Sequence, residues 1–143
     1  MPNWNRAIAM PIAAWRTSVR FFSVRLVAAI HDDQIRLYGG SYGVRDWSAL
    51  ESTVRQPAAT FDGAYVYGDV LAMAAALGHG LITSHPFVDG NKRTGGMAML
   101  TFAAVNGVRC PIPEPAYYEA MMAVATGDMN RGQLDATLRR WTP

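Results

Sequence analysis

Residues 85–96, with the sequence HPFVDGNKRTGG, join two long apolar segments, residues 69–84 and 94–106, that have the composition of buried helices. Within nine residues this stretch holds an imidazole, a carboxylate, a carboxamide and two cations, and a proline and a glycine interrupt it. A loop that only connects two packed helices needs none of these groups. The stretch therefore predicts a corner between two helices that carries a chemical site.

The proline and the glycine define the expected shape of this corner. Pro86 lacks an N–H and disfavours helical geometry in the preceding residue, so we expect His85 at the end of a helix. Gly90 permits a sharp bend, after which the next helix begins. The free N–H groups and the dipole at that helix start form a ready anion site. We expect phosphate to be bound there by Gly90, Asn91, Lys92 and Arg93.

Two further side chains indicate the type of reaction. Asp89 would repel a phosphate unless a cation lay between them, which indicates Mg²⁺ held by one carboxylate and by phosphate oxygens. His85 can accept a proton from an incoming hydroxyl near neutral pH. Together these groups favour phosphoryl or nucleotidyl transfer with His85 as the general base. The alternative, from the residues alone, is an ordinary helix corner with a capping Asp89 and solvated cations.

The same stretch resembles the signature of the Fic/Doc (Fido) family, in which His-x-Phe-x-Asp/Glu-Gly/Ala-Asn precedes a basic helix start. Two positions make it more similar to the Doc branch, the death-on-curing toxins, than to the Fic adenylyltransferases. Lys92 follows the asparagine, and Gly96 stands where Fic proteins have a second arginine. The resemblance runs from about Val19 to Trp141. Further Doc-like segments are residues 29–35, 38–40, 43–46, 125–128 and 137–140.

The resemblance implies a toxin of a toxin–antitoxin system that uses ATP and Mg²⁺ to phosphorylate a Ser or Thr hydroxyl of a protein target. That target would be elongation factor Tu, and its modification would arrest translation. Lys92 and Gly96 favour a nucleotide that presents its γ-phosphate. Attack at the α-phosphate would instead make the chain a Fic-type adenylyltransferase. A third interpretation is an inactive binding module with the Fido fold.

The resemblance also has an implication for regulation. Self-inhibited Fic proteins carry Ser/Thr-x-x-x-Glu-Gly/Asn on an added helix, and no such run occurs in these 143 residues. A toxin without this helix needs a partner in trans. The resemblance therefore implies a Phd-type antitoxin whose helical tail packs in an apolar groove of this chain.

The rest of the sequence predicts an all-α fold. Helical spacing, capping residues and stop signals predict six helices. Their expected ranges are about residues 20–38, 47–56, 70–84, 91–106, 116–125 and 132–140. Ser23, Asp46, Asp69 and Asn130 are the expected N-caps. Short loops and the lack of alternating strands indicate a compact six-helix bundle of the Fido type.

A short flap is expected before the motif helix. Residues 57–68 mix proline, glycine and β-prone aromatic residues, which predicts a loop or a short hairpin. The resemblance implies that this flap aligns the protein target near the site. Phe61, Tyr65 and Tyr67 would then contact the target, and the equal alternative is that they fill gaps in the core.

Three other polar residues are expected to have structural roles. His31 is predicted to be a surface or structural histidine, and His79 a histidine of the core. Arg45, beside the capping Asp46, is expected to fix its corner of the chain.

Length and composition predict one compact domain. Half of the residues are apolar and 17% are charged, which excludes a disordered chain. Residues 18–143 are expected to form the Doc-like domain, and residues 1–17 an N-terminal extension of unknown role.

Composition also bounds the partners and the location. The net charge of +2 without runs of Lys or Arg argues against direct nucleic-acid binding, and the single Cys110 excludes an internal disulfide. The longest apolar stretch, residues 70–83, is shorter than the roughly 20 residues that span a bilayer. We therefore expect a cytoplasmic protein without a membrane segment.

Overall fold

A computed structural model describes residues 19–143 of the chain. Six α-helices make up most of this part, which confirms the predicted all-α fold. The helices are α3 (Val24–Tyr38), α4 (Trp47–Arg55), α5 (Val70–Ser84), α6 (Asn91–Val105), α7 (Glu114–Thr126) and α8 (Arg131–Arg140). A 3₁₀ turn, η1 (Gln56–Ala58), and two short strands, β1 (Thr60–Phe61) and β2 (Ala64–Tyr65), lie between α4 and α5. The expected N-terminal extension, residues 1–17, lies outside the described residues.

The predicted capping residues begin four of these helices. The side chains of Ser23, Asp46, Asp69 and Asn130 each accept a hydrogen bond from the backbone N–H three residues further on. Each bond satisfies a donor that the helix itself cannot pair, and such caps stabilise a helix by about 1 kcal/mol. The local sequence therefore sets where α3, α4, α5 and α8 begin.

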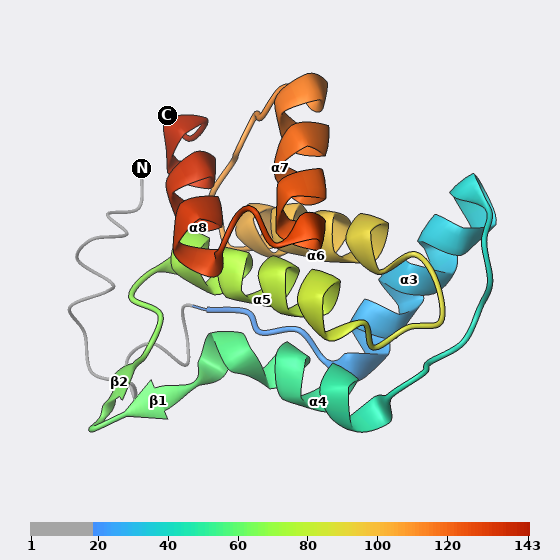
Figure 1. Cartoon of the computed structure of the whole chain (residues 1–143). Coiled ribbons are helices and arrows are strands. Elements are labelled where there is room, and N and C mark those ends of the chain that lie inside the picture. Colours follow the sequence, from blue (N-terminus) through green and yellow to red (C-terminus); the bar gives the residue numbers. More distant parts are fainter. Residues whose placement is uncertain (1–18) are drawn as a thin grey trace.

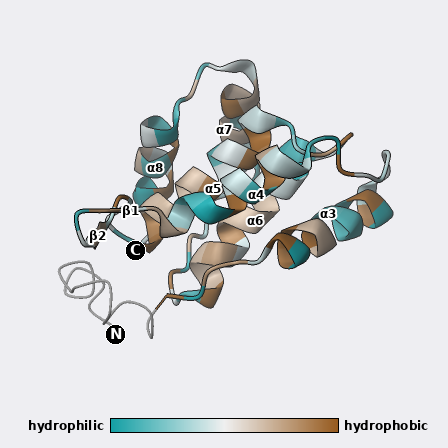
Figure 2. Cartoon of the chain, turned by 90° about the horizontal axis from the view of Figure 1, so that it is seen from below, coloured by the Kyte–Doolittle hydropathy of each residue, from teal (hydrophilic) through white to brown (hydrophobic). Residues whose placement is uncertain are grey.

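Helix α5 lies at the centre of the molecule and packs against α4, α6, α7, α8 and η1 (Figure 1). Its residues from Val70 to Gly78 are all buried, as expected for a helix that is apolar on nearly every side. In Figure 2 helix α3 carries both brown, hydrophobic bands and teal, hydrophilic bands. The motif loop thus connects the central helix to its most extensive packing partner, α6.

Helices α5 and α6 approach closely where two glycines face each other. A Cβ atom on Gly95 would lie 2.9 Å from the carbonyl oxygen of Gly78 and 2.7 Å from a side-chain carbon of Ile82. No side chain fits between the two backbones at this point. Glycine is therefore needed on both helices for their observed separation.

The segment before α5 forms a short hairpin, as predicted. Strands β1 and β2 pair antiparallel, with Thr60 opposite Tyr65 and Phe61 opposite Ala64. Asp62 and Gly63 make the turn with positive φ angles of 50° and 79°. Among residues 19–143, no helix is long and apolar enough to cross a membrane.

Two details differ from the sequence predictions. Helix α7 begins at Glu114, two residues earlier than expected, because Pro115 occupies the first turn, where a missing N–H costs nothing. His79 is not a core histidine: its side chain is only partly buried. Burial lowers the pKa of His79, and the nearby charge of Arg131 lowers it further.

Candidate functional site

The motif loop begins and ends with residues in left-handed backbone conformations. His85 follows the last residue of α5 and has φ 48° and ψ 55°. Gly90 precedes the first residue of α6 and has φ 76° and ψ 18°. These two turns reverse the chain within the six residues from His85 to Gly90, so that the end of α5 and the start of α6 lie close together. The helix-end position predicted for His85 is confirmed.

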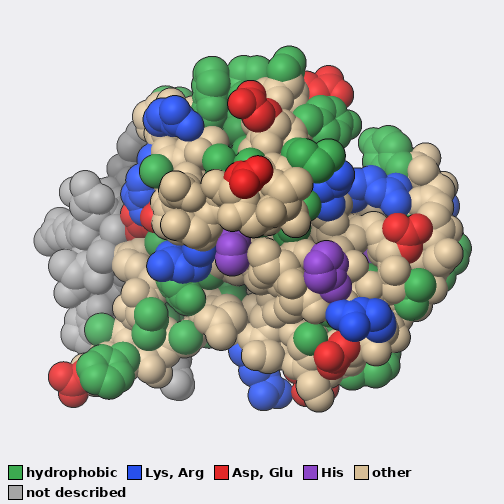
Figure 3. Space-filling model, in the orientation of Figure 1, with side chains coloured by type: hydrophobic (Ala, Val, Ile, Leu, Met, Phe, Trp, Pro, Cys, Tyr) green, Lys and Arg blue, Asp and Glu red, His purple; other side chains and the backbone are tan. Residues whose placement is uncertain are grey.

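All the predicted motif residues line one pocket. Its volume is about 440 Å³, and Ile82, Val88 and Ala125 contribute apolar wall. The motif residues on its lining are His85, Asp89, Gly90, Asn91, Lys92 and Arg93. On the face drawn in Figure 3, histidine side chains reach the surface with Lys or Arg side chains beside them. The imidazole, the carboxylate and the cations are therefore brought together in an accessible hollow.

The floor of the loop is fixed by two aromatic rings. Phe87 is 1% exposed and stacks flat on His31, with ring centroids 3.9 Å apart and an interplanar angle of 2°. His31 is also 1% exposed, and its Nε2 lies 2.7 Å from the carbonyl oxygen of Asp89. The predicted structural role of His31 is thus correct, and its burial shows that it supports the loop from below.

The segment between α3 and α4 covers the other side of the loop. Val88 donates its backbone N–H to the carbonyl of Gly43 at 3.0 Å, and Val44 forms an isolated β-bridge with Phe87. Sequence reasoning missed these contacts. The signal available in the sequence was the group of glycines around Ser41, which indicates that the backbone there comes close to another segment. In the structure a Cβ on Gly40 would lie 2.6 Å from Oδ2 of Asp89.

Asp89 presents an ionised carboxylate to the pocket. Hydrogen bonds from the backbone N–H groups of Ser41 and Gly90 hold the pKa of Asp89 below its ordinary value, and the positive charge of Arg93 adds to the effect. No group of three or more His, Cys, Asp or Glu side chains that could form a metal cage exists among residues 19–143. A single ionised carboxylate fits Mg²⁺ bound jointly with phosphate oxygens, because this ion keeps most of its other ligands as water or phosphate.

The side chain of Asn91 has a different partner from the one expected. Its Oδ1 accepts a hydrogen bond from the backbone N–H of Phe87 at 2.9 Å, and its Nδ2 donates to the carbonyl of Phe87 at 3.0 Å. Both polar atoms therefore brace the loop. The anion site at the start of α6 remains available, because the first helical hydrogen bond is donated by Thr94 to Gly90.

The two adjacent cations have different surroundings. The guanidinium of Arg93 donates to the carbonyl of Gln34 at 3.2 Å and to that of Gly39 at 2.8 Å, at the end of α3. Lys92 makes no hydrogen bond or ion pair with any residue in the described part of the chain. Of the predicted phosphate ligands, Lys92 is therefore the cation whose charge is free to meet an anion.

Arg45 fixes its corner of the chain, as expected, and its side chain does so by binding backbone carbonyls at the start of the motif. Its Nε and Nη2 donate to the carbonyl oxygen of His85 at 2.8 Å and 2.5 Å, and Nη2 also donates to that of Ser84 at 3.2 Å. These oxygens are acceptors that α5 leaves unpaired at its C-terminal end. No local sequence signal points to this contact, because the partners are about forty residues apart.

The expected flap residues do not line this pocket. Phe61 is 79% exposed at the hairpin, free to meet a partner. Tyr65 packs against Phe21, with ring centroids 5.6 Å apart. Tyr67 donates its hydroxyl to Gln56 at 3.1 Å. Of the three, only Phe61 has the exposure expected of a residue that contacts a target.

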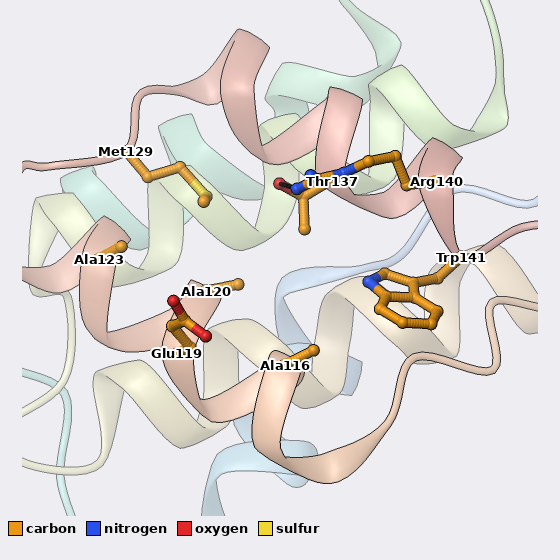
Figure 4. A pocket seen from close by; sticks show the side chains of 8 residues that line it. All are labelled: Ala116, Glu119, Ala120, Ala123, Met129, Thr137, Arg140 and Trp141. Carbon is orange, nitrogen blue, oxygen red and sulfur yellow. Dashed lines mark hydrogen bonds between the residues drawn. The ribbon is translucent and has the colours of Figure 1, made fainter.

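A second hollow, of about 600 Å³, lies between α7 and α8 (Figure 4). Ala116, Ala120 and Ala123 form much of one wall. The indole of Trp141 stands at one end of this hollow, and Glu119 and Arg140 come from opposite helices. The residues that line the hollow include a carboxylate, Glu119, but no imidazole and none of the motif residues. The pocket at the motif is the candidate active site.

Comparison with known proteins gives a matching family model and two similar proteins. The family model described as the Fic/DOC family matches residues 21–103, which include the whole motif. The chain is 37% identical over 103 residues to "Toxin Doc" of Mycolicibacterium smegmatis, a match that covers 71% of this chain and 79% of that protein. It is 29% identical over 122 residues to "Protein kinase doc" of Escherichia phage P1, covering 85% of this chain and 95% of the relative.

Proposed function

Because the chain belongs to the Fic/DOC family, we propose that it is a Doc-type toxin that transfers the γ-phosphoryl group of ATP to a Ser or Thr hydroxyl of a protein target. The observation that carries the proposal is the pocket at the motif, where His85, Asp89 and the uncommitted Lys92 lie around the start of α6. The phage P1 relative, whose name describes it as a protein kinase, supports phosphoryl transfer.

The proposed roles follow from the surroundings of each group. The backbone N–H groups at the start of α6 and the ammonium of Lys92 bind phosphate oxygens. His85 removes the proton of the target hydroxyl, whose oxygen attacks the γ-phosphorus while the bond to the bridging oxygen of ADP breaks. The products are a phosphoester on the target and ADP. Arg93 and Asn91 keep the loop in place, since the described structure commits their side chains to α3 and to Phe87.

Asp89 is the proposed residue for Mg²⁺. Its lowered pKa keeps the carboxylate ionised at neutral pH, as a metal ligand must be. When bound, Mg²⁺ would neutralise charge on the phosphate oxygens. Asp89 itself is kept in place by the Ser41 N–H and by the close approach of Gly40.

The transferred group distinguishes this proposal from its nearest alternative. Purified chain, ATP and Mg²⁺ are incubated with elongation factor Tu, the target that the family resemblance suggests, and the target is then analysed by intact-mass spectrometry. A phosphoryl group is the expected addition. An adenylyl group would identify a Fic-type adenylyltransferase, and no addition to any protein of a cell extract would indicate a binding module.

The role of His85 is tested by growth arrest. Expression of the chain alone is expected to stop growth, and His85→Ala should relieve the arrest by lowering transfer at least about 100-fold, the usual contribution of a general base. His79→Ala is the matched control, because His79 is also partly exposed but does not line the pocket. The assignment of His85 as the base is wrong if its variant is as toxic as the parent.

We further propose that a Phd-type antitoxin neutralises the chain in trans and that the chain acts in the cytoplasm, where translation takes place. Toxicity that is fully suppressed by co-expression of a small protein from the neighbouring reading frame, and not by an unrelated helical protein, would support this partner. Pull-down of the pair at equal stoichiometry is the direct measurement.

A further inference from the structure

The backbone of the proposed base is held in an uncommon conformation. His85 and Asp62 are the non-glycine residues with positive φ angles among residues 19–143. A residue with a Cβ rarely adopts this region, and it persists where surrounding contacts fix it. Asp62 lies in a hairpin turn with Gly63, where such a conformation is ordinary. His85 lies at the pocket and needs a separate explanation.

The contacts that fix His85 come from one corner of the chain. The guanidinium of Arg45 bridges the carbonyl oxygens of Ser84 and His85 through three hydrogen bonds. The backbone N–H groups of Arg45 and Asp46 both donate to the carbonyl of Pro86, at 2.7 Å and 3.1 Å. Three consecutive carbonyl groups are therefore held by two adjacent residues.

This clamp determines where the imidazole points. The direction of the Cα–Cβ bond relative to α5 depends on the φ angle of His85, and the ψ angle sets the direction of the loop that follows. In the left-handed conformation the side chain lines the same pocket as Asp89 and Lys92. Extended backbone values, which a following proline favours, would send the side chain in a different direction.

We propose that Arg45 is a positioning residue for His85: its guanidinium holds the carbonyls at the end of α5 so that the imidazole faces the pocket. Arg45 does not line that pocket in the described structure, so it acts through His85 and not on the ligand. This role rests on the proposed function of His85 as general base.

The first test compares Arg45→Ala and Arg45→Lys with Arg36→Ala. Arg36 is the matched control, because it is an exposed arginine whose guanidinium pairs with Asp33 on its own helix. Both Arg45 variants should lower kcat at least about tenfold and leave the KM for ATP within about twofold, since a displaced base impairs chemistry more than binding. Lysine keeps the positive charge at the end of α5 but lacks the fork that bridges two carbonyls.

The second test reads the conformation without activity. In isotope-labelled protein, the left-handed conformation gives a strong nuclear Overhauser effect between the amide proton and the Hα of His85. This signal should weaken in Arg45→Ala and in Arg45→Lys and remain in Arg36→Ala. If Arg45→Ala does not fold, Arg45→Lys alone is compared with Arg36→Ala in both the kinetic and the resonance measurement.

Two outcomes would overturn the inference. The first is a kcat within about twofold of the parent in Arg45→Lys, which would show that charge alone suffices. The second is an unchanged His85 signal in folded Arg45 variants. If the parent protein itself transfers no phosphoryl group, the proposed function fails, and the resonance measurement still decides whether Arg45 positions His85.

Discussion

Lys92 and Arg93 are neighbours in the sequence, but the fold gives them different tasks. The guanidinium of Arg93 binds the carbonyls of Gln34 and Gly39 and so joins α6 to the end of α3. Lys92 lines the pocket and has no partner in the described part of the chain. The sequence assigns both cations to the phosphate. In the structure only Lys92 is available to bind it, whereas Arg93 stabilises the contact between α6 and α3.

This division predicts different effects of two alanine substitutions. Lys92→Ala should weaken the binding of ATP with Mg²⁺ by about 10- to 100-fold, the loss expected for a charged hydrogen bond, and leave the melting temperature unchanged. Arg93→Ala should lower the free energy of unfolding by about 1–3 kcal/mol, because two carbonyls lose their donor. Calorimetric titration and thermal unfolding of both variants check this, and equal melting temperatures would contradict it.

Side-chain partners were the part of the site that could not be predicted. The sequence placed the six predicted base, metal and phosphate residues at one helix corner, and the structure brings these six to one pocket. The residue pattern did not indicate that the side chain of Asn91 binds the backbone of Phe87, or that Arg45 donates to the carbonyl of His85. The Arg45 contact joins residues 40 apart in the chain, and the Asn91 contact, although only four residues long, depends on the backbone conformation of the loop. A pattern of residue types specifies neither.

The capping residue of α5 has two kinds of partner. Asp69 accepts the N–H of Ala72 and also forms a 2.6 Å ion pair with Arg139 of α8. Burial pushes the pKa of Asp69 upward, but the hydrogen bonds from Arg139 and Ala72 outweigh this and leave the pKa below its ordinary value. One carboxylate therefore begins the central helix and also attaches the last one to it.

The charge of Asp69 should be visible in the acid dependence of stability. Because its pKa is lowered in the folded state, the carboxylate contributes fully above its unfolded value of 3.8 and loses this contribution as the pH falls through the folded pKa. Asp69→Asn keeps a capping oxygen and removes the charge, so its destabilisation, below about 1 kcal/mol, should shrink in acid.

Asp69→Ala is the companion variant, because it removes the cap as well as the charge. It should cost about 1–2 kcal/mol at neutral pH and retain part of that cost in acid. Urea denaturation of both variants across about pH 3 to 7 is the measurement. A constant difference between Asp69→Asn and the parent over that range would show that the ion pair contributes nothing.

The helices themselves were largely predictable, because their signals are local. Ser23, Asp46, Asp69 and Asn130 begin their helices as predicted, and glycine or proline ends several of them. The exception is His79, which an apolar helix was expected to bury. Burial depends on whether a neighbouring element covers that side of α5, and the spacing of residues along a single helix does not contain this information.

At the scale of the whole described chain, residues 19–143, the most extensive packing is between α5 and α6, whose backbones approach closely where they cross. Gly95 lies against the Gly78 carbonyl and Ile82, and Gly78 lies against Met99. The sequence marks these glycines only as unfavourable residues in helices, each costing about 1 kcal/mol relative to alanine. Their contribution is the close approach of the two helices that bear the motif.

A pair of glycine substitutions should therefore act in opposite directions. Gly95→Ala should destabilise the protein by about 1–3 kcal/mol, because its methyl group would overlap the neighbouring helix. Gly132→Ala in α8 is the control: the added methyl meets only an ordinary contact at 3.5 Å, so stability should rise by up to about 1 kcal/mol. Denaturant midpoints compare the two, and stabilisation by both would mean that the crossing is looser than described.

The flat stacking of His31 on Phe87 has a consequence for how the site can respond to a ligand. The carbonyl of Asp89 also lies 2.7 Å from Nε2 of His31, so the loop contacts α3 at two points, which restrict its movement relative to that helix. When a nucleotide binds, we therefore expect the side chains that line the pocket to change conformation more than the loop backbone does, chiefly the long side chain of Lys92. Preorganisation of this kind spares the ordering entropy that a mobile loop would lose on binding.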